Sequence, residues 1–129
     1  MESEALPVLR KFEVTYYRNQ DWCRAFFYAG GSFAANNVET CTLSPKGVPA
    51  FSPAAETAFA EIEKVLEHSG SSVHIIRRAA GGYEFVPDCF GCGTYYFYVP
   101  AYTLPSDIPG ERLHYPLNEN WYRVQQDWN

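Results

Sequence analysis

The sequence lacks any apolar run that approaches the roughly 20 residues needed to span a membrane as a helix. Its amino terminus, Met-Glu-Ser-Glu, also lacks the basic and apolar regions of a signal peptide. We therefore expect a soluble chain with no membrane partner, which is either cytoplasmic or the mature form of a secreted protein.

Clusters of basic residues are missing as well. The net charge is −5, and the only adjacent basic pairs are Arg10-Lys11 and Arg77-Arg78. Binding to a nucleic-acid backbone requires a basic face that neutralises the phosphates. The sequence therefore predicts no nucleic-acid partner, and its acidic charge suits a basic protein partner better.

Recognisable catalytic and nucleotide-binding motifs are absent. The glycine pairs at 30–31 and 81–82 lack the spacing and the lysine of a phosphate-binding loop. The three histidines, at 68, 74 and 114, show no metal-ligand spacing, and no nucleophile stands beside His114 in the sequence. Asp107 and Glu111 are explained equally well as an acid and base pair or as solvated loop charges. These absences favour a protein that is not an enzyme and needs no cofactor.

Aromatic residues are abundant: the chain of 129 residues has ten tyrosines and nine phenylalanines against a single methionine. Hydrophobic residues make up 47% of the chain and charged residues only 19%. This composition predicts a sizeable core in one domain that covers residues 1–129. Aromatic side chains fit a pleated surface well, so the composition also favours strands over helices.

Alternation of side chains predicts several strands, and one segment is typical of a helix. Ser52 is a suitable N-cap, Pro53 suits the first helical position, and Gly70 suits a helix end. Between Ser52 and Gly70, apolar residues recur every three or four positions on one face. The strands are expected at residues 11–18, 22–29, 38–43, 72–78, 83–86 and 94–99.

The fold class predicted from this order is α+β, with an antiparallel sheet of about five or six strands and one central helix packed on one face. From about residue 100, four prolines interrupt any regular pattern, so we expect an irregular C-terminal tail. Asn118 is a candidate cap for a short terminal helix that would place Trp121, Val124 and Trp128 on one side.

The four cysteines leave three interpretations open. Cys89 and Cys92 have the spacing of a metal knuckle or a redox dithiol, whereas Cys23 and Cys41 are isolated. A zinc site of four cysteines normally has a second close pair, and the strand expected after Cys92 removes the helix dipole that activates a redox thiol. Disulfides or buried thiols are therefore favoured. In a secreted protein, our first pairing would be Cys23 with Cys41 and Cys89 with Cys92.

The function predicted by these features is a small non-enzymatic protein-binding domain of the inhibitor, immunity or assembly-subunit type. Tyrosine and tryptophan are typical anchors of protein interfaces. The candidate binding residues are Trp121, Tyr122, Trp128, Tyr95 and Tyr96. Packing of the tryptophans over the sheet is the other explanation of this tail, because large aromatic residues are more often buried than exposed.

Two alternative functions remain. One is a small enzyme or ligand-binding protein with an aromatic pocket under the sheet, lined by Tyr95, Phe97, Tyr83 and His114. The weaker one is a metal or redox domain that uses Cys89 and Cys92.

Overall fold

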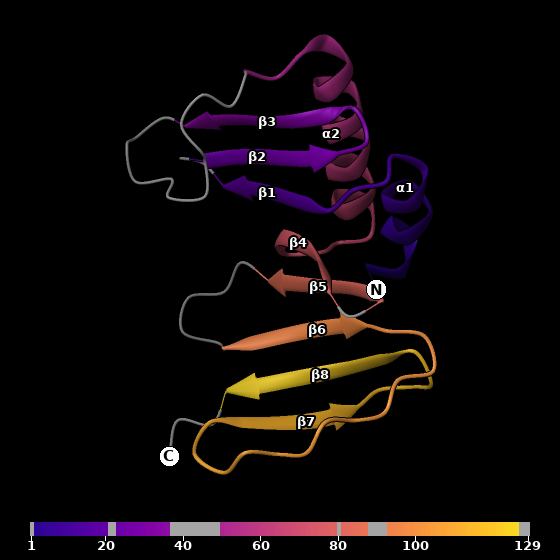
Figure 1. Cartoon of the computed structure of the whole chain (residues 1–129), viewed down its shortest axis with the longest axis vertical. Coiled ribbons are helices and arrows are strands. Elements are labelled where there is room, and N and C mark those ends of the chain that lie inside the picture. Colours follow the sequence, from indigo (N-terminus) through magenta and orange to yellow (C-terminus); the bar gives the residue numbers. More distant parts are fainter. Residues whose placement is uncertain (1, 21–22, 37–49, 80, 88–92, 127–129) are drawn as a thin grey trace.

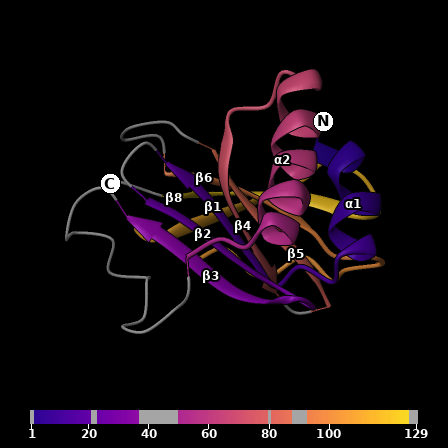
Figure 2. The ribbon, with the colours of Figure 1, turned by 90° about the horizontal axis from the view of Figure 1, so that it is seen from above.

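The computed structural model describes residues 2–20, 23–36, 50–79, 81–87 and 93–126. The elements in this part of the chain are η1 (Glu2–Ala5), α1 (Leu6–Lys11), β1 (Tyr16–Gln20), β2 (Cys23–Tyr28), β3 (Gly31–Asn36), α2 (Pro53–His68), β4 (Val73–Ala79), β5 (Gly82–Pro87), β6 (Thr94–Tyr98), β7 (Arg112–Pro116) and β8 (Trp121–Gln126). The strands form one open antiparallel sheet in the order β3-β2-β1-β4-β5-β6-β8-β7. Both α-helices lie on the same face of this sheet (Figures 1 and 2). The α+β fold class is confirmed.

Helix α2 is the element that the sequence predicted best. The Ser52 hydroxyl accepts a hydrogen bond from the Ala55 N–H at 3.1 Å, which satisfies one of the free amides of the first turn. Pro53 occupies the first helical position, as predicted. Gly70 follows the helix with a φ of 70°, a conformation that glycine adopts without steric cost.

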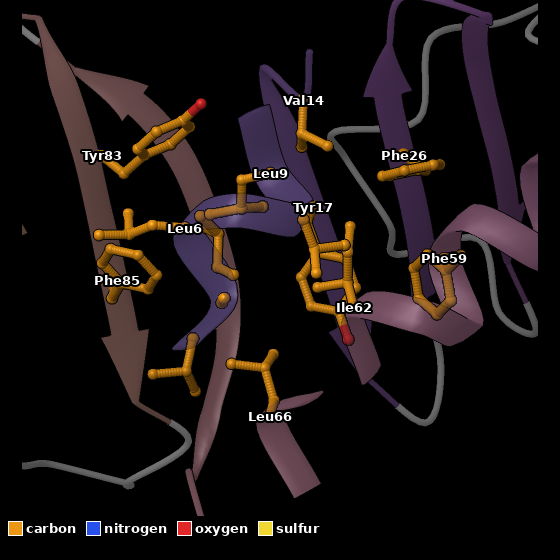
Figure 3. Close-up of a cluster of buried hydrophobic side chains, with 14 of the residues drawn as sticks. Leu6, Leu9, Val14, Tyr17, Phe26, Phe59, Ile62, Leu66, Tyr83 and Phe85 are labelled. Atoms are coloured by element: carbon orange, nitrogen blue, oxygen red, sulfur yellow. The ribbon is translucent and has the colours of Figure 1, made fainter. Parts of the chain in front are cut away.

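A hydrophobic core fills the space between the helices and the sheet (Figure 3). Phe59 of α2 stacks on Tyr17 of β1 with ring centroids 4.8 Å apart, and it meets the Phe26 ring of β2 edge-on at 5.8 Å. Helix α1 adds Leu6 and Leu9, which Figure 3 shows on the side of the cluster nearer to Phe85 of β5. The two helices therefore cover different parts of one sheet face, α2 over β1 and β2 and α1 nearer to β5.

The expected irregular tail is wrong in its second half, where residues 112–126 form the hairpin of β7 and β8. Trp121 and Arg123 point to one face and Tyr122 and Val124 to the other, a period of two that the helix-like spacing of Trp121 and Val124 concealed. Asn118 caps a turn and not a helix, since its side-chain oxygen accepts hydrogen bonds from the N–H groups of Asn120 and Trp121. The sheet therefore has eight strands, and not five or six.

The first expected strand, at residues 11–18, is also wrong in its first half. A short helix, α1, begins at Leu6 with Pro7 in its first turn, and it buries Leu6 and Leu9 before β1 starts. Glu13, with a φ of 52°, lies in the tight connection between them. The third strand is β3, directly after the turn at Ala29 and Gly30. The strand expected at residues 38–43 lies outside the described residues.

No helix in the described part of the chain is both long and apolar enough to cross a membrane.

Candidate functional site

The face of the sheet opposite α2 carries a continuous row of cross-strand neighbours. Buried Ile76 and Phe85 belong to the core on the helix side, so their chain neighbours Arg77 and Glu84 point to the other face. The register extends this row from Arg77 through Glu84 and Phe97 to Tyr122. Four strands thus bring together residues that lie up to 45 positions apart in the sequence.

A cavity of about 450 Å³ opens over this row. Its lining residues are Arg77, Glu84, Tyr95, Phe97, Pro105, Arg112, His114, Tyr122, Val124 and Gln126. They come from β4, β5, β6, β7 and β8, and Pro105 comes from the connection that precedes β7. Most of the cavity is therefore built on strands, which hold side chains more rigidly than loops do.

The floor of the cavity is aromatic. The rings of Phe97 and Tyr122 stack nearly parallel, 5.1 Å apart with an interplanar angle of 7°, and Tyr102 packs on Tyr122 at 4.8 Å. Burial raises the pKa of Tyr122, and the negative charge of Glu84 and the neighbouring Tyr102 raise it further. Tyr122 therefore stays neutral at physiological pH, and the floor is a largely apolar cluster of aromatic rings.

Charged side chains stand around this floor. The Arg77 side chain donates a hydrogen bond to the carboxylate of Glu84, whose side chain is only 16% exposed. Arg112 also lines the cavity, and within the described residues it has no carboxylate partner. Among the described residues, the cavity thus contains one arginine that is paired with a carboxylate and one that is not.

His114 is held in place by Asp107. The side chain of His114 is only 6% exposed, and its Nδ1 lies 3.3 Å from Oδ1 of Asp107. The same carboxylate oxygen accepts the backbone N–H of His114 at 2.6 Å. A carboxylate on Nδ1 fixes the orientation of the imidazole and leaves Nε2 as the nitrogen available to other groups. Asp107 therefore orients a histidine in the wall of the cavity.

The structure separates the residues that the sequence suggested for binding. Tyr95 and Tyr122 line the cavity, whereas Tyr96 and Trp121 point to the helix face, where Trp121 is 4% exposed. Trp128 lies outside the described residues. Of the residues suggested for an aromatic pocket, Tyr95, Phe97 and His114 do lie together, whereas Tyr83 is on the other face of the sheet.

Sequence reasoning missed the charged residues of the cavity. Arg77 and Glu84 lie at equal distances on either side of the turn between β4 and β5, so an antiparallel hairpin places them opposite one another. The predicted hairpin is therefore sufficient to infer that Arg77 and Glu84 are cross-strand neighbours. Arg112 and Gln126 could not be found in the same way, because they belong to the two strands that the sequence did not reveal.

Cys23 is buried, 1% exposed, and disulfide-bonded. Its partner lies outside the described residues, as do Cys41, Cys89 and Cys92, so the pairing of Cys23 with Cys41 stays a prediction. No group of three or more histidine, cysteine, aspartate or glutamate side chains in the described ranges is arranged to hold a metal ion.

Comparison of the whole chain with known proteins gives no relative: it matches no family model, no curated protein and no solved structure.

Proposed function

We propose that the protein binds a small organic acid in the cavity on the helix-free face of the sheet. The observation that carries this proposal is the combination of a stacked aromatic floor, Phe97 on Tyr122, with an arginine, Arg112, that has no carboxylate partner in the described part of the chain. Ligand sites are typically concave and largely apolar, with a few polar groups that fix the orientation of the ligand.

The chemistry of the lining selects a class of ligand. A flat ring would pack against the rings of the aromatic floor, where an aromatic contact adds about 0.5 to 1.5 kcal/mol to the burial of its surface. A carboxylate on that ring would accept hydrogen bonds from Arg112, and Nε2 of His114 offers a further polar contact. Glu84 is occupied by Arg77 and therefore repels such an anion less than a free carboxylate would.

Calorimetric titration with 2-naphthoate and with its neutral analogue 2-naphthamide tests this proposal. We expect the carboxylate to bind at least about tenfold more tightly than the amide, because a hydrogen bond to a charged group contributes about 1.5 to 3 kcal/mol. In the variant Arg112→Gln, this preference should disappear, whereas the affinity for 2-naphthamide should change little.

Arg78→Gln is the matched control, because Arg78 is also an exposed strand arginine but does not line this cavity. It should bind both compounds as the wild type does. If 2-naphthoate fails to bind, or if Arg112→Gln and Arg78→Gln lose the same affinity, the proposal is overturned.

A second candidate function, binding to another protein, rests on a different surface. Four large apolar side chains are exposed by 37 to 45%, and all of them lie between residues 104 and 117: Leu104, Ile108, Tyr115 and Leu117. The acidic residues Asp107 and Glu111 are exposed in the same stretch, and exposed Glu119 follows it. This apolar margin of β7 suits a partner with an apolar patch flanked by basic residues.

Cross-linking in extracts of the native source tests this second candidate. We expect a stoichiometric cross-linked partner for the wild type that is lost in Leu117→Ser, because a polar side chain removes part of the buried apolar contact. Arg112→Gln should retain the partner. A partner that survives the double variant Ile108→Ser, Leu117→Ser would place the interface elsewhere and contradict this candidate.

A further inference from the structure

A second cavity, of about 370 Å³, lies on the helix side of the sheet. It is lined by Arg10, Arg78, Gly81, Gly82, Tyr83 and Tyr98. Figure 1 places α1 at the end of the sheet where β5 begins and β6 ends, and Arg10 of α1 reaches Tyr98 of β6 there. None of the residues that line the first cavity takes part in this one.

The charge of this cavity is positive, although the chain as a whole carries −5. Three other basic side chains are paired with glutamates: Lys11 with Glu61, Arg24 with Glu56 and Arg77 with Glu84. Neither Arg10 nor Arg78 has a carboxylate partner among the residues that the structure describes, and none of the cavity's lining residues is acidic. Two positive charges therefore face the same space without compensation.

The two guanidinium groups are presented by ordered elements. The Arg10 guanidinium donates a hydrogen bond to the Tyr98 hydroxyl at 3.0 Å, and its central carbon lies 5.5 Å from the centre of that ring. Arg78 belongs to β4, and its backbone N–H is bound to the carbonyl of Thr15 at 3.0 Å. Each guanidinium has five N–H donors, so Arg10 keeps donors for a ligand after its bond to Tyr98.

The cavity has free space beside Gly81, one of its lining residues. Apart from Gly81 itself and its two chain neighbours, no atom lies within 4 Å of the position that a Cβ would take at Gly81. A group the size of a phosphate can therefore approach without displacing protein atoms at that point.

We propose that Arg10 and Arg78 form a binding site for a tetrahedral oxyanion, that is, a phosphate or sulfate group. Arginine recognises such groups through parallel N–H···O hydrogen bonds, and two arginines neutralise the two negative charges of a phosphate monoester. This site is separate from the cavity proposed to bind an organic acid, and it does not depend on that proposal.

Titration with inorganic phosphate, followed by ³¹P NMR and by calorimetry at low ionic strength, tests the site. We expect saturable one-to-one binding by the wild type and an affinity about tenfold weaker in Arg78→Gln and in Arg10→Gln. Arg78→Lys should recover part of the loss, because it restores the charge but not the fork of donors.

Arg112→Gln is the matched control and should bind phosphate as the wild type does, whereas Arg78→Gln should bind 2-naphthoate normally. Each of the two proposals can therefore be refuted without refuting the other. Arg10→Gln also loses the hydrogen bond to Tyr98, so its unfolding midpoint must be measured. The Arg78 side chain makes no such bond to the described residues, so phosphate binding by Arg78→Gln tests the site even if Arg10→Gln is unstable. Phosphate affinity that is unchanged in Arg78→Gln, or no saturable binding by the wild type, would overturn the proposal.

Discussion

Replacement of Phe59 by alanine is expected to lower the free energy of unfolding by about 3 to 5 kcal/mol. Phe59 is 2% exposed and lies where α2 meets the sheet. Its ring contacts Tyr17 at 4.8 Å, Phe26 at 5.8 Å and Phe51 at 5.3 Å, so one side chain links four segments of the chain. Alanine would remove all of these ring contacts and leave a cavity that its aromatic neighbours fill only in part.

Such a loss is large against the roughly 5 to 15 kcal/mol that separates most folded domains from their unfolded state. Urea unfolding followed by tryptophan fluorescence measures it, with Cys23 kept oxidised in every sample. Phe59→Leu should cost less, because it retains more of the apolar volume. Leu104→Ala, at an exposed site, should change the free energy of unfolding by no more than about 0.5 kcal/mol. A cost for Phe59→Ala close to that of Leu104→Ala would mean that α2 does not pack on the sheet as described.

The parts of the fold that the sequence predicted have local signals. Helix α2 has a cap, a first-turn proline, an apolar stripe and a terminal glycine within 19 residues, and each of these acts on its immediate neighbours. The β4–β5 hairpin has a turn glycine and alternating flanks. For such elements, propensity and packing favour the same structure, so a single sequence is sufficient to find them.

The β7–β8 hairpin was missed because its signals conflict. Prolines at 109 and 116 favour a loop, yet Pro116 is tolerated because β7 is an edge strand, where a missing N–H need not break a ladder. Trp121 and Val124 have helical spacing, but every residue from 121 to 125 pairs with a residue of the neighbouring strand β6. Tertiary pairing overrides local preference here.

The candidate site depends on that same hairpin. Without β7 and β8, the sequence suggests Tyr95, Phe97 and His114 as pocket residues but gives no reason to place Arg112 beside them. The stacking of Phe97 on Tyr122 follows from the β6–β8 register, which only the structure shows. The sequence thus suggests which types of residue line the cavity, but it does not show that these residues lie together.

Gly82→Ala is expected to lower the free energy of unfolding by about 3 kcal/mol, the upper end of the usual cost of overpacking. A Cβ at Gly82 would overlap the backbone carbonyl oxygen of Tyr98 and lie 3.1 Å from Cα of Val99. Both obstacles are backbone atoms at the end of β6, so no rotation of a side chain relieves the clash. The close approach of β5 and β6 at this point therefore requires glycine.

Gly81→Ala is the matched control, because the same methyl group is added one residue earlier. Beyond its own chain neighbours, nothing lies within 4 Å of its Cβ position. Its φ of 85° is left-handed, however, so we expect a cost of about 1 to 2 kcal/mol from the backbone alone. Urea unfolding gives both costs, and amide exchange of Tyr83 and Phe85 reports whether the β5–β6 pairing opens. If Gly82→Ala costs no more than Gly81→Ala, then β6 can shift to accommodate the methyl group. In that case β5 and β6 pair less tightly at this point than their geometry implies. Tyr98, which lines the cavity with Arg10 and Arg78, would then also be held less rigidly.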